Sequence, residues 1–537
     1  MTEPAATPSS APPAAPTTNA PEGTTTAGTT TAGTAPAGTA PAGTAAPETP
    51  WRRLDRRMLV VGPLGSLGRL LPVVVVVLLT GDAGDPVRLG AALAAAVAVV
   101  LGGVVRWRTT RYRITGDRVE LHSGLLLRRR RSVPRDRIRT VDLTARLLHR
   151  AFGLSVVQVA AASGSPLESA RLDLDAVSAA EAERLRRELL DRSPVAGDEA
   201  AAPAGEVLSR LDWAWIRYAP LTVTAVAGVG AIGAFVFNLL DDLGVDPRDL
   251  EAVDVVTDRL AATPVWVAVG TVVAALVTLS AVGAVVLWAE RWYGYLLLRE
   301  QGGDGTALRV RRGLLTRRSL SVAEARLRGA EVSEPLLLRA GGGAQAGALS
   351  TGLERGGQGG ALQPPVPRAE ALRVASAALR EPPAEIVAAP LLPHPPAART
   401  RRLSRALVPA AAVAVALGLL LPPGGWLGLL LLPAAALLGL DRARSLGHAL
   451  TARHVVVREG SLVRRTVALR REGVLGWTVR QSSFQRRAGL VTVEAVTAAG
   501  AGGYRVLDIG AVDGVRLADA ATPGLLPRPE EDPCPAS

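Results

Sequence analysis

The stretch that decides the fold is Ser123-Gly124-Leu125-Leu126-Leu127-Arg128-Arg129, because it returns twice further along the chain. It reads Arg312-Gly313-Leu314-Leu315-Thr316-Arg317-Arg318 the second time and Glu459-Gly460-Ser461-Leu462-Val463-Arg464-Arg465 the third time. In each copy a glycine is followed by small or apolar residues, and an arginine pair begins four residues after it. A motif that recurs in this way indicates an internal repeat.

A second shared segment lies 28 or 29 residues downstream of the first. It reads His149-Arg150-Ala151-Phe152-Gly153-Leu154 in the first copy and Gln485-Arg486-Arg487-Ala488-Gly489-Leu490 in the third. The middle copy keeps only Leu338-Arg339-Ala340-Gly341, and we interpret its glycine-rich residues 341–360 as an insertion. Two shared segments at matched spacing predict three copies of one domain.

Between these segments the first copy has the pattern of β-strands closed by a helix. Alternating apolar pairs predict four strands, at Tyr112 and Ile114, Val119 and Leu121, Val157 and Val159, and Leu172 and Leu174. Thr115-Gly116-Asp117 supplies a hairpin turn between the first two. Ser178 and Glu181 predict a capping box for a helix with an apolar face of Ala182, Leu185 and Leu189. A comparable helix follows Pro367 in the second copy, whereas Gly514 interrupts the pattern in the third.

Six apolar runs form three hairpins, one before each copy of the domain. They span Leu64–Thr80, Leu89–Val105, Tyr218–Leu240, Pro264–Ala289, Ala406–Leu421 and Gly425–Leu440. A helix needs about 20 apolar residues to cross a bilayer, which the third and fourth runs exceed. The last two runs are short and are joined by Pro422-Pro423-Gly424, so they form either two short spans or a re-entrant hairpin.

Charge predicts how the hairpins are oriented. All 61 basic residues are arginine and the formal net charge is +13. A basic protein of this kind typically binds nucleic acid or a membrane surface. The apolar runs favour the membrane. Arginines flank the outer ends of the first and third hairpins, whereas the loop of the second, residues 241–258, has seven acidic residues and one arginine. The positive-inside rule therefore predicts cytoplasmic termini and cytoplasmic domains.

These patterns divide the chain into ten segments. They are a disordered tail (1–50), hairpin 1 (58–106), domain 1 (107–191), a linker (192–212), hairpin 2 (213–290), domain 2 (291–380), a proline-rich linker (381–402), hairpin 3 (403–441), domain 3 (442–522) and a disordered tail (523–537). Residues 1–50 are rich in Ala, Thr, Pro and Gly and lack the apolar run of a signal peptide. We interpret them as a cytoplasmic tail in preference to a mucin-like stalk.

Five segments of the first copy carry a resemblance to a known family. They are Tyr112–Thr115, Gly124-Leu125 with the arginines that follow, Ser132–Val141, Arg150–Leu154 and Ala182–Leu185. Together they resemble the bacterial pleckstrin-homology-like (PH-like) family in its membrane-anchored YdbS/YdbT-like branch, over most of residues 55–522. The resemblance implies a bent β-sandwich or open barrel capped by one C-terminal helix. The expected fold is therefore about six membrane-spanning helices in hairpins plus three cytoplasmic PH-like domains, and the resemblance implies no activity.

The residues do not predict a catalytic, cofactor or metal site. The single cysteine, Cys534, excludes an intramolecular disulfide and a cysteine-based metal cluster. The five histidines lack the spacing of a zinc-binding helix, and the glycine-rich segments lack the Lys-Ser/Thr of a phosphate-binding loop. We therefore expect that the protein is not an enzyme and needs no cofactor.

The best candidates for binding are the arginines that follow the repeated glycine. They are Arg128, Arg129, Arg130, Arg131, Arg317, Arg318, Arg464 and Arg465. They could bind anionic lipid headgroups, each charge contributing on the order of 1 kcal/mol near a membrane surface. Alternatively, their charge protects an exposed strand edge from unwanted pairing. Adjacent arginines on a strand point to opposite faces, so only half of them could face one ligand.

These inferences predict a multi-pass protein of the inner (plasma) membrane that acts as a scaffold or binding module. The resemblance suggests a role in envelope stress or in resistance to membrane-active agents. The expected partners are the lipid bilayer, anionic lipid headgroups, and another PH-like membrane protein or a second copy of the chain, but not nucleic acid. The alternative is a component of a transport or export system, although the clear spans lack the charged or broken sites that transport requires.

Overall fold

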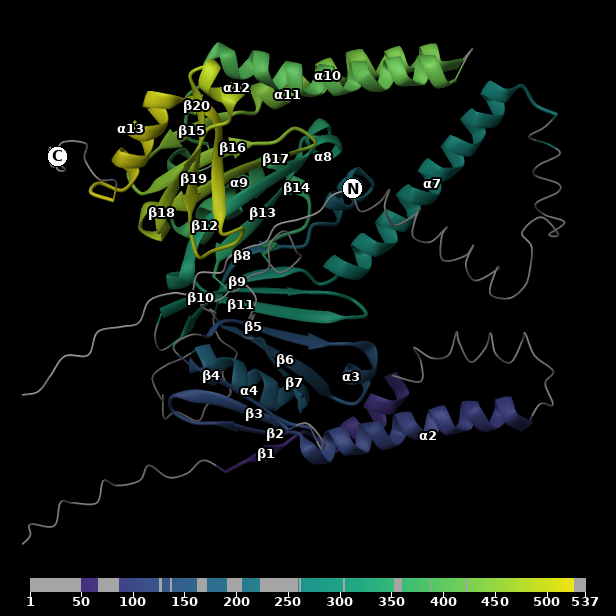
Figure 1. Cartoon of the computed structure of the whole chain (residues 1–537). Coiled ribbons are helices and arrows are strands. Elements are labelled where there is room, and N and C mark those ends of the chain that lie inside the picture. Colours follow the sequence, from purple (N-terminus) through teal and green to yellow (C-terminus); the bar gives the residue numbers. More distant parts are fainter. Residues whose placement is uncertain are drawn as a thin grey trace, which may run out of the picture. The chain divides into compact units, whose positions relative to one another are not determined.

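The computed structural model describes residues 50–65, 86–124, 128–135, 138–161, 171–190, 205–222, 259, 262–302, 305–351, 360–386, 388–421 and 424–525. Within these ranges, three stretches share one order of elements, and we name them repeat 1 (111–190), repeat 2 (296–379) and repeat 3 (447–521). Each has a first antiparallel sheet, then a second sheet with a short helix after its first strand, and then a closing helix (Figure 1).

The elements of the repeats correspond one to one. Repeat 1 contains β2 (Arg111–Ile114), β3 (Arg118–Ser123), β4 (Arg129–Pro134), β5 (Ile138–Ala145), α3 (Leu147–Ala151), β6 (Leu154–Ala161), β7 (Arg171–Ser178) and α4 (Ala179–Leu190). Repeat 2 contains β9 (Leu296–Gly302), β10 (Gly305–Arg312), β11 (Arg317–Ala323), β12 (Leu327–Pro335), α8 (Leu336–Ala340), β13 (Gly343–Ser350), β14 (Val366–Pro367) and α9 (Arg368–Leu379). Repeat 3 contains β15 (Gly447–Leu450), β16 (His454–Glu459), β17 (Val463–Arg470), β18 (Gly476–Arg480), α12 (Ser483–Arg487), β19 (Leu490–Val496), β20 (Gly503–Gly510) and α13 (Ala511–Ala521).

The glycine of the repeated motif is required by the backbone. Gly124, Gly313 and Gly460 have φ angles of +100°, +109° and +99°, in the left-handed region that glycine adopts without strain. A Cβ atom on Gly313 would overlap the carbonyl oxygen of Thr316. The motif therefore recurs because the turn between the second and third strands of each repeat needs this residue.

A second glycine turn recurs in all three repeats, so the middle repeat keeps the same spacing as the other two. Gly153, Gly342 and Gly489 end the short helices α3, α8 and α12 with φ angles of +67°, +73° and +65°. Each lies 29 residues after the first glycine of its repeat. The equivalent glycine in repeat 2 is Gly342, one position beyond the Gly341 that the sequence suggested.

The sheets run from one repeat into the next. β5 of repeat 1 pairs antiparallel with β11 of repeat 2, giving the strand order β7-β6-β5-β11-β10-β9-β8. β12 of repeat 2 pairs in the same way with β17 of repeat 3, giving β14-β13-β12-β17-β16-β15. At the two ends of the series, β4 corresponds to β11 and β17, and β18 corresponds to β5 and β12. Each of these two strands is the last of its sheet in the described part of the chain.

The chain before each apolar hairpin also enters a sheet. β1 (Arg52–Arg53) pairs with β2, and β8 (Glu206–Arg210) pairs with β9. Before the third hairpin, an isolated bridge joins Leu392 to His448 of β15. Part of the expected linker 192–212 is therefore a strand, because it completes the first sheet of repeat 2.

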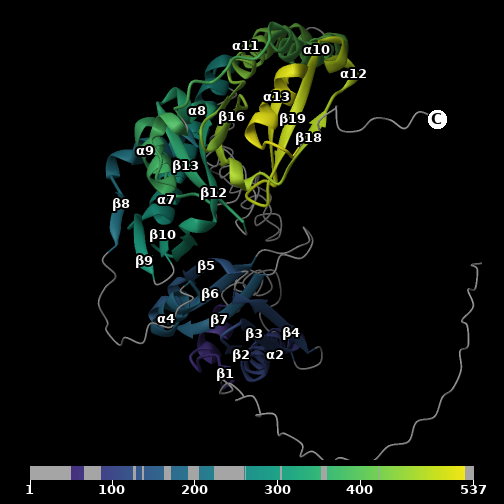
Figure 2. The same cartoon turned by 90° about the vertical axis from the view of Figure 1, so that its left-hand side faces the viewer.

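The closing helices cover the second sheets (Figure 2). In α4 the predicted apolar face of Ala182, Leu185 and Leu189 is buried, and the Oγ of Ser178 accepts a hydrogen bond from the amide of Glu181 at 3.2 Å. The carboxylate of Glu181 binds Arg52 and does not complete a capping box. α13 continues through Gly514. Glycine is needed there because a Cβ would lie 2.8 Å from Val493, so its absence lets the helix approach the sheet.

The glycine-rich residues that we expected to be an insertion contain a strand of the sheet. Gly343–Ser350 forms β13, and residues 352–359 lie outside the described residues. Small side chains are needed here because Tyr218 and Leu338 pack against the strand, and a Cβ on Gly343 would lie 2.8 Å and 2.6 Å from them. The composition therefore reflects close packing.

Four of the six apolar runs are described in large part, as α2 (Pro86–Thr109), α7 (Val265–Trp292), α10 (Pro396–Leu420), and the short helix η6 (Gly424–Leu430) with α11 (Leu431–Arg444). By length and composition, α7, α10 and the stretch Gly424–Arg444 could cross a membrane. Their apolar side chains are mostly exposed, as lipid-facing residues would be. The runs Leu64–Thr80 and Tyr218–Leu240 lie largely outside the described residues, although residues 218–221 belong to the 3-10 helix η2 (Trp213–Leu221).

Candidate functional site: the junctions between repeats

Two of the three predicted arginine groups lie at the junctions between repeats. Arg317 and Arg318 begin β11 and lie opposite Ala145 and Thr144 of β5. β11 is paired on both sides, so it has no free edge that charge would need to protect from unwanted pairing. The sequence could not reveal this, since nothing local to β11 specifies which strand lies beside it.

At the second junction, the arginines bind carboxylates of the same chain. Arg464 Nη2 lies 3.4 Å from Asp441, near the end of α11, and its Nε donates to the hydroxyl of Ser445 at 3.1 Å. Asp441 also accepts a hydrogen bond of 2.9 Å from Arg339. Arg465 Nε lies 3.4 Å from Glu331, and burial raises the pKa of Glu331.

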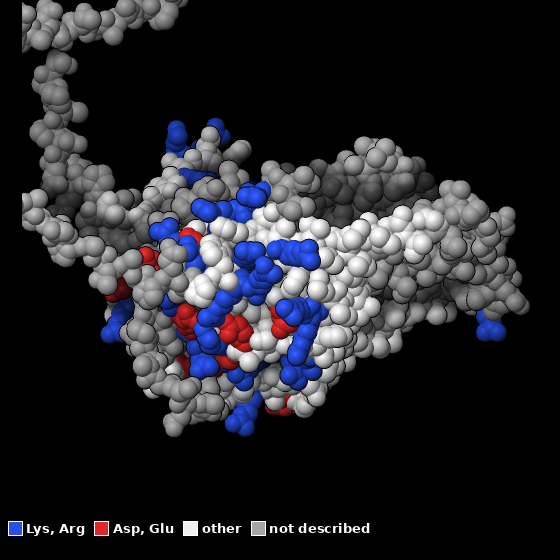
Figure 3. All heavy atoms as spheres, turned by 90° about the horizontal axis from the view of Figure 1, so that it is seen from below, with Lys and Arg blue, Asp and Glu red and all other residues white. Residues whose placement is uncertain are grey.

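The first group, Arg128–Arg131, is exposed on and just before β4. Basic side chains, with several acidic ones between them, lie on this side of the molecule beside a surface without charged residues (Figure 3). Arg130 Nε donates a hydrogen bond of 2.6 Å to Nε2 of His122, and the ring of Trp51 lies 4.2 Å from that imidazole. The aromatic partner was missed from the sequence because Trp51 is far away along the chain.

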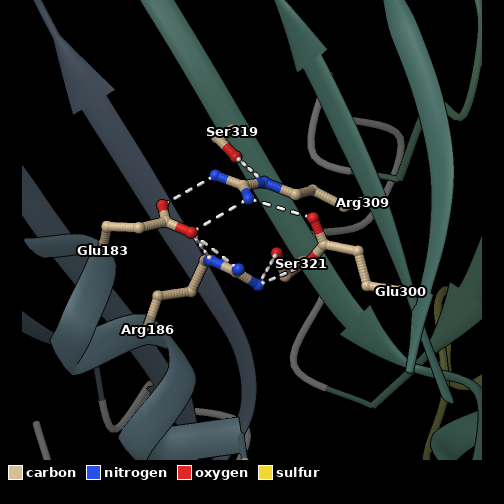
Figure 4. A network of polar contacts seen from close by, with 6 residues as sticks. All are labelled: Glu183, Arg186, Glu300, Arg309, Ser319 and Ser321. Carbon is tan, nitrogen blue, oxygen red and sulfur yellow. Dashed lines mark hydrogen bonds and ion pairs between the residues drawn. The ribbon is translucent and has the colours of Figure 1, made fainter. Parts of the chain in front are cut away.

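A buried ion-pair network joins repeat 1 to repeat 2 (Figure 4). Arg309 of β10 donates to the carboxylate of Glu183 on α4 at 3.0 and 2.8 Å, and to Glu300 of β9 at 3.0 Å. Arg186 of α4 lies 2.7 Å from Glu183 and 2.9 Å from Glu300. Both arginine side chains are only 4% exposed, and each contacts the two carboxylates.

Hydrogen bonds to serine complete this network. Arg309 Nε donates to the hydroxyl of Ser319 at 2.8 Å, and Arg186 Nη1 to that of Ser321 at 3.3 Å. Burial opposes ionisation of Glu183, but hydrogen bonds and charge from Arg186 and Arg309 lower its pKa to about 2. The junction is therefore held in one register, because a sliding strand would leave buried charges without partners.

Sequence reasoning missed these residues. The available signal was the spacing of Glu183 and Arg186, three apart on the polar side of a helix, which by itself predicts only a weak surface pair. Their partners, Glu300 and Arg309, are more than 100 residues away in the sequence. Only the pairing of β5 with β11 brings these side chains together.

Comparisons with known proteins identify the domain type. The bacterial PH domain family matches residues 65–193 and 396–522. UPF0699 transmembrane protein YdbT of Bacillus subtilis (strain 168) is 27% identical over 156 residues, which cover 27% of this chain and 31% of that protein. The chain thus matches less than a third of the length of this curated relative. No solved structure matches the chain.

The chain is therefore a membrane protein with bacterial PH domains. The resemblance seen in the sequence is confirmed, because two stretches of the chain match the bacterial PH domain family and the chain is similar to a transmembrane protein named YdbT.

Proposed function

We propose that this protein is a six-span scaffold of the inner membrane that presents three cytoplasmic PH-like domains as one assembly. The observation that carries this proposal is the pairing of β5 with β11 and of β12 with β17. Domains that act separately would not share sheets, whereas shared sheets hold the binding surfaces of neighbouring domains in a fixed arrangement. The network of Glu183, Arg186, Glu300 and Arg309 supports a fixed register at the first junction.

The count of three domains rests on repeat 2, which lies outside the two ranges that match the family. Its elements follow the order of repeats 1 and 3, and Gly313 and Gly342 have the same backbone conformation as their counterparts. The low similarity of its sequence is accounted for by β13, where packing selects glycine and alanine. We therefore treat repeat 2 as a third PH-like domain.

The topology is tested by reporter fusions to the full chain. Fusions after residues 195, 385 and 530 should report a cytoplasmic location, and a fusion after residue 250 should report the opposite side. The arginines that flank the outer ends of the hairpins motivate this expectation. An external signal after residue 195 or 530 would overturn the cytoplasmic placement.

The scaffold role is tested by purifying the tagged full chain from native membranes and identifying the proteins and lipids recovered with it. We expect defined protein partners at fixed ratios, and we expect a strain without the protein to be more sensitive to membrane-active agents. We propose no catalytic activity. Recovery of bulk lipid alone, together with unchanged sensitivity, would overturn the scaffold role.

A further inference from the structure

A cavity of about 550 Å³ lies at the end of α7, between that helix and the strands of repeat 2. Three arginines line it, namely Arg291 of α7, Arg312 at the end of β10 and Arg318 of β11. Trp288 and Trp292 of α7 form part of the same wall. The cavity thus lies where a candidate membrane-spanning helix meets the soluble domain.

The arginines are held close to one another in spite of their like charges. The guanidinium groups of Arg291 and Arg312 both lie over the ring of Trp292, at 5.4 and 4.3 Å from its centroid. Arg312 is 9% exposed, and burial together with the charges of Arg291 and Arg318 lowers its pKa to about 9. Such a cluster is destabilised unless an anion accompanies it.

The described residues do not supply that anion in full. Glu290 lies in the wall, and the charge of Asp142 acts on Arg312, but no carboxylate in the described ranges forms an ion pair with Arg291 or Arg318. The indole nitrogen of Trp288, a side chain that is 5% exposed, and the Nε of Arg291 have no hydrogen-bond partner there. Buried donors are rarely left unsatisfied, so an acceptor near these two nitrogens would stabilise this end of α7.

The other two repeats show how an acceptor is supplied at this position. In repeat 3, the counterpart of Arg318 is Arg465, whose Nε lies 3.4 Å from Glu331, and Asp441 near the end of α11 binds Arg339 and lies beside Arg464. In repeat 1, a cavity of about 410 Å³ at the end of α2 has Arg129 in the place of Arg318, and there Asp175 forms an ion pair with Arg106. The end of α7 differs from both, because no carboxylate in the described ranges forms an ion pair with Arg291 or Arg318.

We propose that this cavity binds the phosphate group of an anionic lipid headgroup. Guanidinium groups and an indole N–H are suitable donors for phosphate oxygens, and tryptophans near a helix end are typical of the headgroup region. The proposal rests on the membrane placement of α7 within the proposed function, and it names the lipid chemistry that repeat 2 recognises.

The test uses the full chain in nanodiscs of phosphatidylcholine, with or without phosphatidylglycerol. Native mass spectrometry measures how much phosphatidylglycerol each variant retains. Arg318→Gln should lower retention about fivefold, the effect of one charge near a membrane surface. Arg317→Gln is the matched control, because Arg317 is the neighbouring exposed arginine on β11 and does not line the cavity. It should retain the lipid as the unchanged protein does.

Thermal unfolding gives a second measurement that does not depend on mass spectrometry. In phosphatidylcholine alone, Arg318→Gln should unfold at a higher temperature than the unchanged protein, because one of three like charges is removed. Phosphatidylglycerol should raise the unfolding temperature of the unchanged protein more than that of Arg318→Gln.

Two outcomes would overturn the proposal. Equal retention by Arg317→Gln and Arg318→Gln would exclude the cavity as the lipid site. If inorganic phosphate in phosphatidylcholine nanodiscs stabilised the unchanged protein as much as phosphatidylglycerol does, the ligand would be a free phosphate and not a lipid. The reporter fusions test the topology separately, so a cytoplasmic signal after residue 195 combined with equal retention would overturn this site and leave the scaffold in place.

Discussion

Glu183 on the closing helix of repeat 1 and Arg309 on the first sheet of repeat 2 are joined by two hydrogen bonds, of 3.0 and 2.8 Å, although 126 residues separate them in the sequence. Arg309 also binds Glu300, and Glu300 binds Arg186, so the contact closes a ring of four charges across the junction (Figure 4). The stability of the assembly should therefore depend on this ring.

Removing the most buried carboxylate of the ring should destabilise the protein strongly. Glu300→Gln leaves two buried guanidinium groups short of a charge, and we expect a loss of about 3 kcal/mol in the free energy of unfolding. Urea unfolding of the full chain in detergent measures this. Arg184→Gln is the control, because that exposed side chain makes only long ion pairs of 3.8 and 4.0 Å and should change stability by less than about 0.5 kcal/mol. Equal midpoints for the two variants would contradict the role of the ring.

A buried histidine pair should make the protein sensitive to mild acid. His394 Nε2 lies 3.1 Å from Nδ1 of His448, and burial together with the charge of His448 lowers the pKa of His394 from 6.5 to about 4, against the opposing effect of Asp508. The unfolded chain takes up this proton first, so stability is fully present above pH 6.5 and is lost as the pH falls towards 4. The loss should reach up to about 3 kcal/mol.

The measurement is the unfolding midpoint at a pH above 6.5 and at a pH near 4. His394→Gln should lose less stability between these conditions than the unchanged protein, because glutamine takes up no proton. A variant that loses as much as the unchanged protein would show that other groups dominate the acid response.

The repeated glycine should not tolerate even alanine. Gly313→Ala places a Cβ against the carbonyl oxygen of Thr316 at a φ of +109°, so we expect a loss of about 2 kcal/mol or more. Gly116→Ala, in the turn between β2 and β3, is the control, since no atom lies within 4 Å of the added Cβ. Thermal unfolding of both variants should show a large shift for the first and a small one for the second. Similar shifts would mean that the backbone at Gly313 can relax.

The arginines of β4 separate two hypotheses about the first repeat. Replacing Arg128–Arg131 with Gln should increase self-association, because β4 ends its sheet whereas the equivalent strands β11 and β17 are paired with a neighbouring repeat. Light scattering coupled to size-exclusion chromatography in detergent measures this. Replacing Arg111 and Arg118, which are exposed on inner strands, should have no such effect. A fall in retained anionic lipid without self-association would favour lipid binding by these arginines instead.

Much of the local structure could be predicted from the sequence. Alternation at Tyr112 and Ile114 indicated β2, and the spacing of Ala182, Leu185 and Leu189 indicated α4, because both elements bury one face. Gly124 indicated the turn that its positive φ requires. These features depend on residues that lie near one another in the chain.

The rest depends on contacts between distant residues. Glycine and alanine in β13 were interpreted as an insertion because Tyr218, which packs against Gly343, is more than 100 residues away in the sequence. The same holds for Gly514, because the side chain that leaves no room for a Cβ there belongs to Val493 on another element. The candidate site was the least predictable, because a neighbouring repeat supplies the strands beside β11 and β17 and the carboxylate of Glu331 beside Arg465.

The pairing of β8 with β9 has a consequence for the order of events during synthesis. β8 leaves the ribosome before the second apolar hairpin, and its partner strand leaves only after it. The edge of this sheet can therefore close only once both legs of the hairpin have been made, and β1 and β2 impose the same order on the first hairpin. The sheet can therefore be complete only in a chain whose intervening hairpin has already been synthesised.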